Sequence, residues 1–330
     1  MEETYSNEIY LSPGPHFSSK RKTQQIMMLV VASLIPECAA GVYHFGLPAL
    51  FTILISVASC VLFEALFQLA CRKPVQIYDF SAVITGILLA LTLPPTVPYW
   101  MIVIGSFFAI VVAKGFFGGL GCNVWNPALT GRAFLVIGFP FALGGSWVAP
   151  GADAVSSATP LANPQALLSS DISFRLDYYW NLFIGNHAGC IGETCIAAIL
   201  ISAVFLLITN VIDWRAPVSM LATCLILSVL ASNDALYTLM SGGLLFGAVF
   251  MATDYTTAPV TKPGRIIFGA GCGLITFLIR QFGGYPEGVM FSILIMNSLV
   301  PFLNKISQRK YGYNSRIKTA RKNIHEEKAQ

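Results

Sequence analysis

A stretch of small and hydroxyl-bearing residues near the middle of the chain is the part most suited to covalent chemistry. It reads Asp153-Ala154-Val155-Ser156-Ser157-Ala158-Thr159-Pro160-Leu161 and lies in the longest polar interval between hydrophobic segments. Nothing in it favours a helix, and a loop of this kind presents its hydroxyls to a second enzyme. We therefore expect a site of covalent modification here, with an ordinary Ser/Thr-rich loop as the alternative.

The same stretch resembles the pattern Asp-x-x-Ser/Thr-x-Ala-Thr, on which a flavin transferase esterifies the phosphate of FMN to the threonine. The resemblance extends over roughly residues 20–305 and rests on further segments in the same order. These segments are Gly121–Arg132, Gly189–Thr194, Met251–Asp254 and Gly283–Gly288. The chain is similar to the NqrB/RnfD family, which contains the D-type chains of Rnf ion-translocating oxidoreductases and the B-type chains of sodium-pumping NADH:quinone reductases.

The resemblance implies covalent FMN on Thr159, with Asp153 read by the transferase and Ser156, Ser157 and Ala158 giving access to the hydroxyl. It also implies a bacterial cytoplasmic membrane, a neighbouring flavin-bearing subunit and iron–sulfur subunits, because this chain has no nicotinamide or iron–sulfur motif of its own.

The expected function is that of one subunit of a ferredoxin:NAD oxidoreductase of the Rnf type, in which electron transfer drives Na⁺ or H⁺ across the membrane. The short tail ahead of the first hydrophobic segment, residues 1–25, favours this over the B-type chain of the quinone-reducing sodium pump. A solute channel or transporter of the same fold, without redox work, is the alternative from another class of protein.

The composition indicates a membrane protein. Of the 330 residues, 55% are hydrophobic and 11% are charged, and the mean hydropathy is +0.68, whereas soluble domains carry about 25% charged residues. The basic residues lie mainly at the chain ends and in loops, which argues against a nucleic-acid-binding face. The cysteines and histidines lack the spacing of a metal site, so we expect no metal and read the cysteines as packing residues.

The hydrophobic segments predict an all-α polytopic membrane protein with about ten transmembrane helices, because helices satisfy their own backbone in lipid. Residues 1–25 and 305–330 would be polar tails around a transmembrane domain, 26–304, that includes a long loop at 144–190. The expected segments are 26–46, 49–71, 80–93, 99–117, 128–143, 191–210, 216–230, 235–252, 265–281 and 287–304.

The distribution of charge predicts the orientation of these segments. With the N-terminus inside, the inner regions hold all of the 20 Lys and Arg residues except Arg175 and Arg280. The positive-inside rule therefore selects cytoplasmic termini. This orientation places the 144–190 loop, and Thr159 with it, on the outer side. A flavin held there needs other subunits to bring electrons across the membrane.

Two features concern the symmetry of the fold. Segments 80–93 and 216–230 are short for a bilayer, and short segments in two halves of a transporter indicate a midplane site. A weak echo pairs Asp79-Phe80 with Asp213-Trp214 and Gly131-Arg132 with Gly264-Arg265. Five helices per half would give inverted repeats, whereas the echo pairs loops on the same side. The resemblance implies two related halves in a fold like that of urea transporters.

Several polar residues are candidates for cofactor binding. Asn126 and Arg132 bracket the start of the fifth segment and could hold a second, non-covalent flavin, since relatives are associated with bound riboflavin; helix capping is the alternative. Asp254, among threonines, forms a similar group at the inner side. Arg175 could neutralise the phosphodiester of the covalent flavin, with a solvated surface arginine as the alternative.

Carboxylates inside the apolar segments are candidates for ion handling. Glu37 and Glu64 would face a bundle interior or a cavity, on a path for Na⁺ or H⁺. For Glu64 an ion pair near the end of the helix is an equal alternative. Glu193 and Glu287 are expected in the first turns of their helices, where they would complement the helix dipole and serve the structure alone.

Overall fold

A computed structural model describes residues 22–144, 172–283 and 287–306, and within these ranges the chain is helical, without strands. The all-α prediction is therefore confirmed. The elements are α1 (Thr23–Phe45), α2 (Leu47–Ala70), α3 (Ser81–Leu91), α4 (Tyr99–Phe107), the π-helix η1 (Phe108–Gly115), α5 (Pro127–Gly138), α6 (Pro140–Gly144), α8 (Ile172–Ile184), α9 (Ile196–Ile208), α10 (Arg215–Leu230), α11 (Ala235–Met240), α12 (Leu244–Phe246), the π-helix η3 (Gly247–Met251), α13 (Lys262–Phe282) and α14 (Val289–Ile306).

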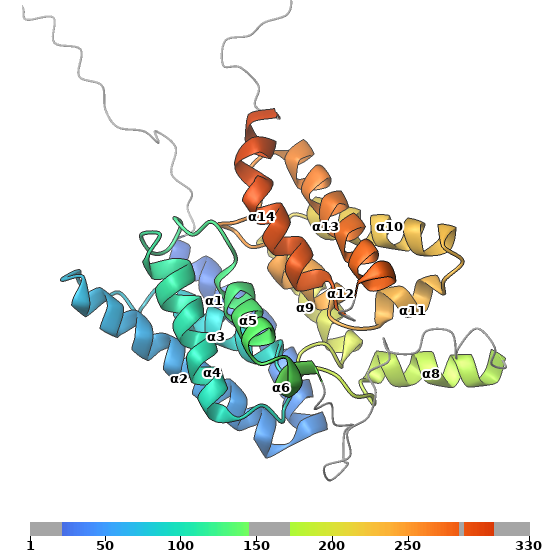
Figure 1. Cartoon of the computed structure of the whole chain (residues 1–330), viewed down its shortest axis with the longest axis horizontal. Helices are drawn as coiled ribbons and strands as arrows, with labels where there is room; N and C mark the ends of the chain where they lie inside the picture. Colours follow the sequence, from blue (N-terminus) through green and yellow to red (C-terminus); the bar gives the residue numbers. More distant parts are fainter. Residues whose placement is uncertain (1–21, 145–171, 284–286, 307–330) are drawn as a thin grey trace, which may run out of the picture.

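The helices form two groups that follow the chain order (Figure 1). Helices α1 to α6 make the N-terminal group, in which α2 packs against α3 and α4, and helices α9 to α14 make the C-terminal group, in which α13 packs against α10 and α14. The groups meet where α1 contacts α9 and where α5 contacts α14. Helix α8 lies to one side of both groups.

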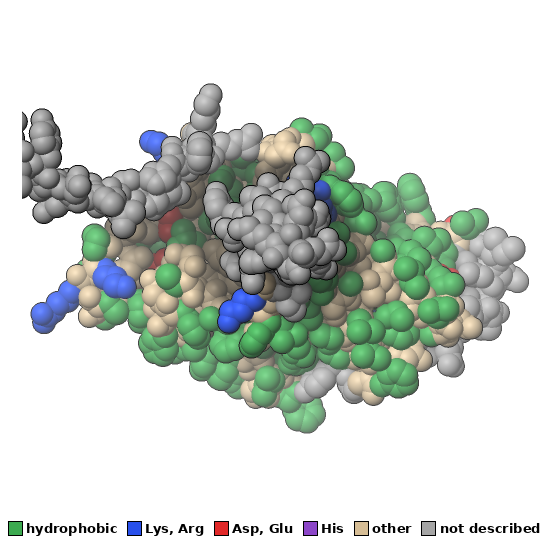
Figure 2. All heavy atoms as spheres, turned by 90° about the horizontal axis from the view of Figure 1, so that it is seen from above, with side chains coloured by type: hydrophobic (Ala, Val, Ile, Leu, Met, Phe, Trp, Pro, Cys, Tyr) green, Lys and Arg blue, Asp and Glu red, His purple; other side chains and the backbone are tan. Residues whose placement is uncertain are grey.

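The outer surface of the bundle is apolar, as expected for a protein in lipid. Among the described residues, three helices are long and apolar enough to span a membrane, namely Thr23–Phe45, Leu47–Ala70 and Lys262–Phe282, and the other apolar helices there are shorter. Large hydrophobic side chains such as Leu54 and Ile201 are more than half exposed, and hydrophobic atoms cover the flanks of the molecule in Figure 2. The count of ten spans stays a prediction.

Several loops gather at one end of the bundle, which we call the basic end. They are residues 71–80, 116–126, 209–214 and 252–261. The Asn123 amide donates to Thr256 across the two groups, and Arg265 of α13 pairs with Asp213 within the C-terminal group. Figure 2 looks onto this end, where Lys and Arg side chains are visible. The predicted inner regions thus lie together in space.

Some predicted segments are not continuous helices. Segment 128–143 divides at Phe139, because Pro140 cannot donate a backbone hydrogen bond to the preceding turn. Segment 235–252 is interrupted at 241–243, where Gly242 has a φ of +66°. Segment 191–210 becomes helical only at Ile196. The prediction of single helices was wrong for these segments.

The loop predicted at 144–190 contains helix α8. Two of its tyrosines make specific contacts: the Tyr179 hydroxyl donates to the Asp234 carboxylate, and the centroid of the Tyr178 ring lies 6.3 Å from that of Tyr237. Helix α8 therefore docks on α11.

One of the two pairs of the weak internal repeat has the same local structure at both of its positions. The Asp79 carboxylate accepts from the amide of Ser81 at 3.1 Å, and the Asp213 carboxylate accepts from the amide of Arg215 at 3.1 Å. These matching turns begin α3 and α10. The other pair does not correspond, because Arg132 and Arg265 bind different partners in different surroundings.

Close packing of α2 on α3 depends on Gly86. The Ser56 hydroxyl donates to the Gly86 carbonyl at 2.7 Å, and a Cβ at position 86 would lie 2.7 Å from the Cα of Val57. We predict that Gly86→Val destabilises the protein by about 1–3 kcal/mol through overpacking, measured as a lower melting temperature in detergent. Gly138→Val is the matched control, because nothing lies within 4 Å of a Cβ there. Equal melting temperatures of the two variants would contradict the packing.

Candidate functional site

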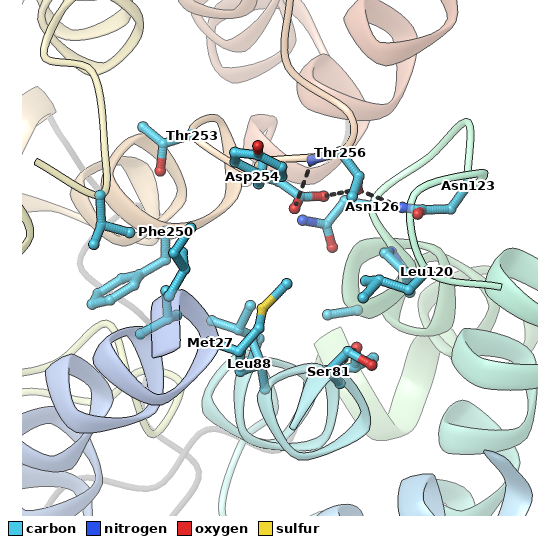
Figure 3. A pocket seen from close by; sticks show the side chains of 18 of the residues that line it. Met27, Ser81, Leu88, Leu120, Asn123, Asn126, Phe250, Thr253, Asp254 and Thr256 are labelled. Carbon is cyan, nitrogen blue, oxygen red and sulfur yellow. Dashed lines mark hydrogen bonds between the residues drawn. The ribbon is translucent and has the colours of Figure 1, made fainter. Parts of the chain in front are cut away.

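A cavity of about 100 Å³ lies between the two groups of helices near the basic end. We call it the Asn126 cavity. Much of its lining is apolar and comes from four separate helices, through Val30 of α1, Leu88 of α3, Leu206 of α9 and Phe250 of η3. Figure 3 shows Met27, also of α1, projecting into the same space. The cavity has the apolar lining that is typical of sites for organic cofactors.

Polar side chains from two distant loops border the cavity together. The Asn123 amide donates to the hydroxyl of Thr256 at 2.9 Å, and that hydroxyl lies 3.2 Å from the carboxylate of Asp254 (Figure 3). The amide of Asn126 lines the cavity beside them. The structure therefore brings together two polar groups that the sequence placed separately, one around Asn126 and one around Asp254.

Local structure explains how these side chains are held. The Asn126 side chain caps α5 by accepting from the amide of Leu129 at 3.3 Å, and Pro127 occupies the first turn, where a missing amide hydrogen costs nothing. The π-helices η1 and η3 each end just before one of the two loops. Such π-helical turns are frequent at functional sites, because they rotate the following residues out of the regular helix pattern.

The Asp254 carboxylate is partly buried in its loop and held by neighbouring hydroxyls. Burial raises the pKa of Asp254 above its ordinary value, and the hydrogen bonds from Thr257 at 2.9 Å and from Thr256 oppose this rise. The carboxylate is thus a fixed acceptor on the border of the cavity.

A buried ion pair separates the Asn126 cavity from a second, more polar cavity of about 250 Å³. The ammonium of Lys114 lies 2.6 Å from a Glu64 carboxylate oxygen and 2.6 Å from the Ser81 hydroxyl, which in turn donates to Asp79 at 2.9 Å. Lys114 lines both cavities. Glu64 therefore forms the ion pair that was the alternative for it, although its second oxygen has no hydrogen-bond partner among the described residues.

Glu37 lies apart from both cavities. It is 1% exposed on α1, next to the Ser202 hydroxyl of α9, where the two groups of helices meet. No hydrogen bond is formed by one of its carboxylate oxygens within the described part of the chain.

Arg132 does not reach the Asn126 cavity. Its guanidinium instead forms a buried ion pair with the Glu287 carboxylate and contacts the Cys190 sulfur at 3.5 Å. The Glu193 carboxylate lines the same small space, and the Arg280 guanidinium lies nearby. We call Arg132, Glu193, Arg280 and Glu287 the central charged cluster. The placement of Arg132 with the flavin candidates was wrong, since its charge is used here.

Sequence reasoning missed this cluster. Glu193 and Glu287 precede α9 and α14 and are not in their first turns, so the interpretation as helix-dipole residues was wrong. Arg280 was counted only as an outer charge. The available signal was that charged residues flank glycine-rich breaks in apolar segments, which in membrane proteins indicates a functional site.

The predicted flavin-attachment residues, Asp153, Ser156–Ala158 and Thr159, lie outside the described residues. Arg175 falls within α8, but its side chain is also outside the described part.

Comparison with known proteins places the chain in a family. The profile of the NQR2, RnfD, RnfE family matches residues 10–312. The chain belongs to this family. It is 43% identical to the D component of the Na⁺-translocating ferredoxin:NAD⁺ oxidoreductase complex of Acetobacterium woodii, over 96% of this chain and 99% of that protein. It is 39% identical to the D component of the proton-translocating ferredoxin:NAD⁺ oxidoreductase complex of Clostridium ljungdahlii, over 92% and 95% of the two chains.

A third relative, the D component of the ion-translocating oxidoreductase complex of Stutzerimonas stutzeri, is 39% identical over 91% of this chain and 95% of its own length. The segments on which the family resemblance rests lead to the two places described above. Asn123 and Asn126 of the first segment and Asp254 of the third border the Asn126 cavity. Arg132, Glu193 and Glu287, from the first, second and fourth segments, belong to the central charged cluster.

The ion pairs of the Asp213 carboxylate at the basic end can be tested through their dependence on pH. It binds Arg265 at 2.7 Å and Arg215 at 2.8 Å. Partial burial opposes ionisation, but the hydrogen bonds from the Arg215 amide and from both guanidiniums outweigh it and lower the pKa of Asp213 below 3.8.

Because the pKa is lowered on folding, ionised Asp213 stabilises the folded chain above its ordinary pKa, and this contribution is lost as the pH falls through the folded value. We predict that Asp213→Asn lowers the melting temperature at neutral pH and that the difference from wild type disappears in acid. A difference that is constant with pH would contradict the ion pairs.

Proposed function

We propose that this chain is the membrane-embedded D-type component of an ion-translocating ferredoxin:NAD⁺ oxidoreductase, with FMN bonded to Thr159. The observation that carries the proposal is the match of nearly the whole chain to the D components of such complexes, at 43% and 39% identity. Other subunits would supply the nicotinamide and iron–sulfur chemistry. Among them a second flavin-bearing subunit would exchange electrons with this one.

The relatives favour this function over a component of a quinone-reducing sodium pump, because the three described above are all named as D components of ion-translocating oxidoreductases. Their names do not decide whether the transported cation is Na⁺ or H⁺. One of them is named as Na⁺-translocating and another as proton-translocating at a similar identity. Glu37 and Glu64 stay our candidates for the ion path, since both are buried carboxylates with an oxygen that is unpaired among the described residues.

Attachment of FMN to Thr159 rests on the sequence pattern from Asp153 to Thr159. When bound, FMN supplies one- and two-electron redox chemistry that no side chain of this protein provides. Thr159 would hold the flavin through a phosphoester, so its retention would not depend on binding affinity. We place this loop on the outer face and both termini in the cytoplasm, from the excess of Lys and Arg in the other loops.

We further propose that the Asn126 cavity holds a second, non-covalent flavin, such as riboflavin. An isoalloxazine has an apolar dimethylbenzene edge and a pyrimidine edge that both donates and accepts hydrogen bonds. The cavity offers matching surfaces, with Leu88 and Phe250 on its apolar lining and Asn123, Asn126 and Asp254 on its polar border. Its position between the two groups of helices would exclude water from the bound ring.

Covalent attachment has a simple test. In a denaturing gel of protein made with the flavin transferase, the wild-type band should fluoresce under ultraviolet light, because an ester-bound flavin survives unfolding. Thr159→Ala should abolish this fluorescence, and Ser157→Ala, in the same loop, should retain it. A dark wild-type band would favour the channel alternative, and fluorescence in Thr159→Ala would contradict the assignment of the hydroxyl.

The second flavin can be tested by filling the cavity. Met27 projects into it, whereas the neighbouring Met28 is 45% exposed on the outer surface of α1. We predict that Met27→Trp weakens flavin binding about tenfold or more, which corresponds to a clash of about 1.4 kcal/mol. Flavin released by heat and measured by chromatography should fall in this variant and not in Met28→Trp. Equal flavin content in the two variants would place the flavin elsewhere.

A further inference from the structure

The central charged cluster lies where interrupted helices from both groups meet. Arg132 extends from α5 of the N-terminal group, and Glu287 precedes α14 of the C-terminal group. Glu193 comes from the turns before α9, and Arg280 of α13 donates to the carbonyls of Thr238 and Ser241 at the break after α11. The cluster therefore joins elements that are far apart in the sequence.

The two carboxylates of the cluster have unequal partners. Glu287 is paired with the guanidinium of Arg132. Glu193 accepts from the Cys190 amide at 2.8 Å through one oxygen, and its other oxygen is buried without a hydrogen-bond partner in the described part of the chain. The residue is 6% exposed. A buried oxygen without a partner is much more destabilising when it is ionised than when it is protonated.

A proton on Glu193 would also have an acceptor. A carboxylate oxygen of Glu193 and one of Glu287 lie within 4.8 Å of each other and of the Cys190 sulfur. Gly243 faces the two carboxylates with its backbone alone. A Cβ at this position would lie 3.2 Å from the unpaired Glu193 oxygen and 3.8 Å from Glu287. The protonated acid can therefore turn its hydrogen toward the ionised carboxylate of Glu287.

We propose that Glu193 and Glu287 form a proton-binding site that holds one exchangeable proton, with Glu193 as the resident acid. Uptake takes one H⁺ from water onto the free Glu193 oxygen, release returns it to water, and no electron moves. The groups that face the site are Arg132 from α5, Arg280 from α13, Cys190 on the same segment as Glu193, and Glu287 before α14. With the proton bound, the cluster carries one net positive charge, and without it the cluster is neutral.

The same geometry argues against a metal ion or Na⁺ at this place, although a sulfur and two carboxylates are the ligands of many metals. Arg132 donates to the Cys190 sulfur and to one oxygen of Glu287, so fewer of their lone pairs are open to a metal ion. A proton needs only one oxygen and one acceptor, which the site provides.

This inference does not depend on either flavin, and its test needs no turnover. Infrared difference spectra of the purified full-length chain, recorded between acid and alkaline pH in H₂O and D₂O, report protonated carboxyl groups. We expect a carboxylic C=O band that shifts in D₂O, disappears at alkaline pH, and is absent from Glu193→Gln. Glu37→Gln is the matched control, because Glu37 is also buried with an oxygen that is unpaired among the described residues, and it should leave this band in place.

A second variant keeps the test decisive if Glu193→Gln does not fold. Gly243→Ala places a methyl group against the free oxygen and should shift the frequency of the same band without removing it. Identical carboxylic bands in wild type, Glu193→Gln and Gly243→Ala would overturn the proposal. So would a wild-type band that Na⁺ removes at constant pH together with a rise in melting temperature, because the site would then bind Na⁺.

Discussion

The structure depends on one constraint of the lipid environment, which is that every interrupted helix must satisfy its polar backbone groups inside the protein. Several helices of this chain stop within the bundle. The amides of Ile191 and Gly192 donate to the carbonyls of Leu93 and Leu91 at 3.1 and 2.8 Å, and Arg280 donates to the carbonyls after α11. The ion pair of Arg132 with Glu287 then joins the two groups of helices at the same place.

The interrupted helices also place polar side chains at two depths in the bundle. Near the basic end, the loops that follow η1 and η3 bring amide, hydroxyl and carboxylate groups to the border of an apolar cavity, which suits a flat organic cofactor. Deeper in the bundle, the central charged cluster contains buried charges around a much smaller space of about 10 Å³. In our account the first level serves electron transfer and the second serves ion binding, on helices that both groups share.

The sequence predicted the helical class, the family and several of the residues on the cavity, because hydrophobic segments and capping motifs are local signals. It could not predict that Asn126 and Asp254 share one cavity, since that depends on how distant loops pack. It also missed α8, whose polar and aromatic residues resemble a loop. Arg132 was assigned to the wrong site, because a short motif gives a position in the sequence but not the direction of a long side chain. The two positions of the weak internal repeat have similar turns at Asp79 and Asp213 and different surroundings at Arg132 and Arg265, so the repeat itself stays a prediction.

The central claim of this account is that the chain carries a covalent flavin and so takes part in electron transfer. The most direct measurement is the mass of the peptide that trypsin releases between Arg132 and Arg175, which contains Thr159, from the complex assembled in its native membrane. The account predicts that this peptide is heavier than its sequence by FMN less one water, with fragment ions that place the addition on Thr159. A peptide of unmodified mass would contradict the claim.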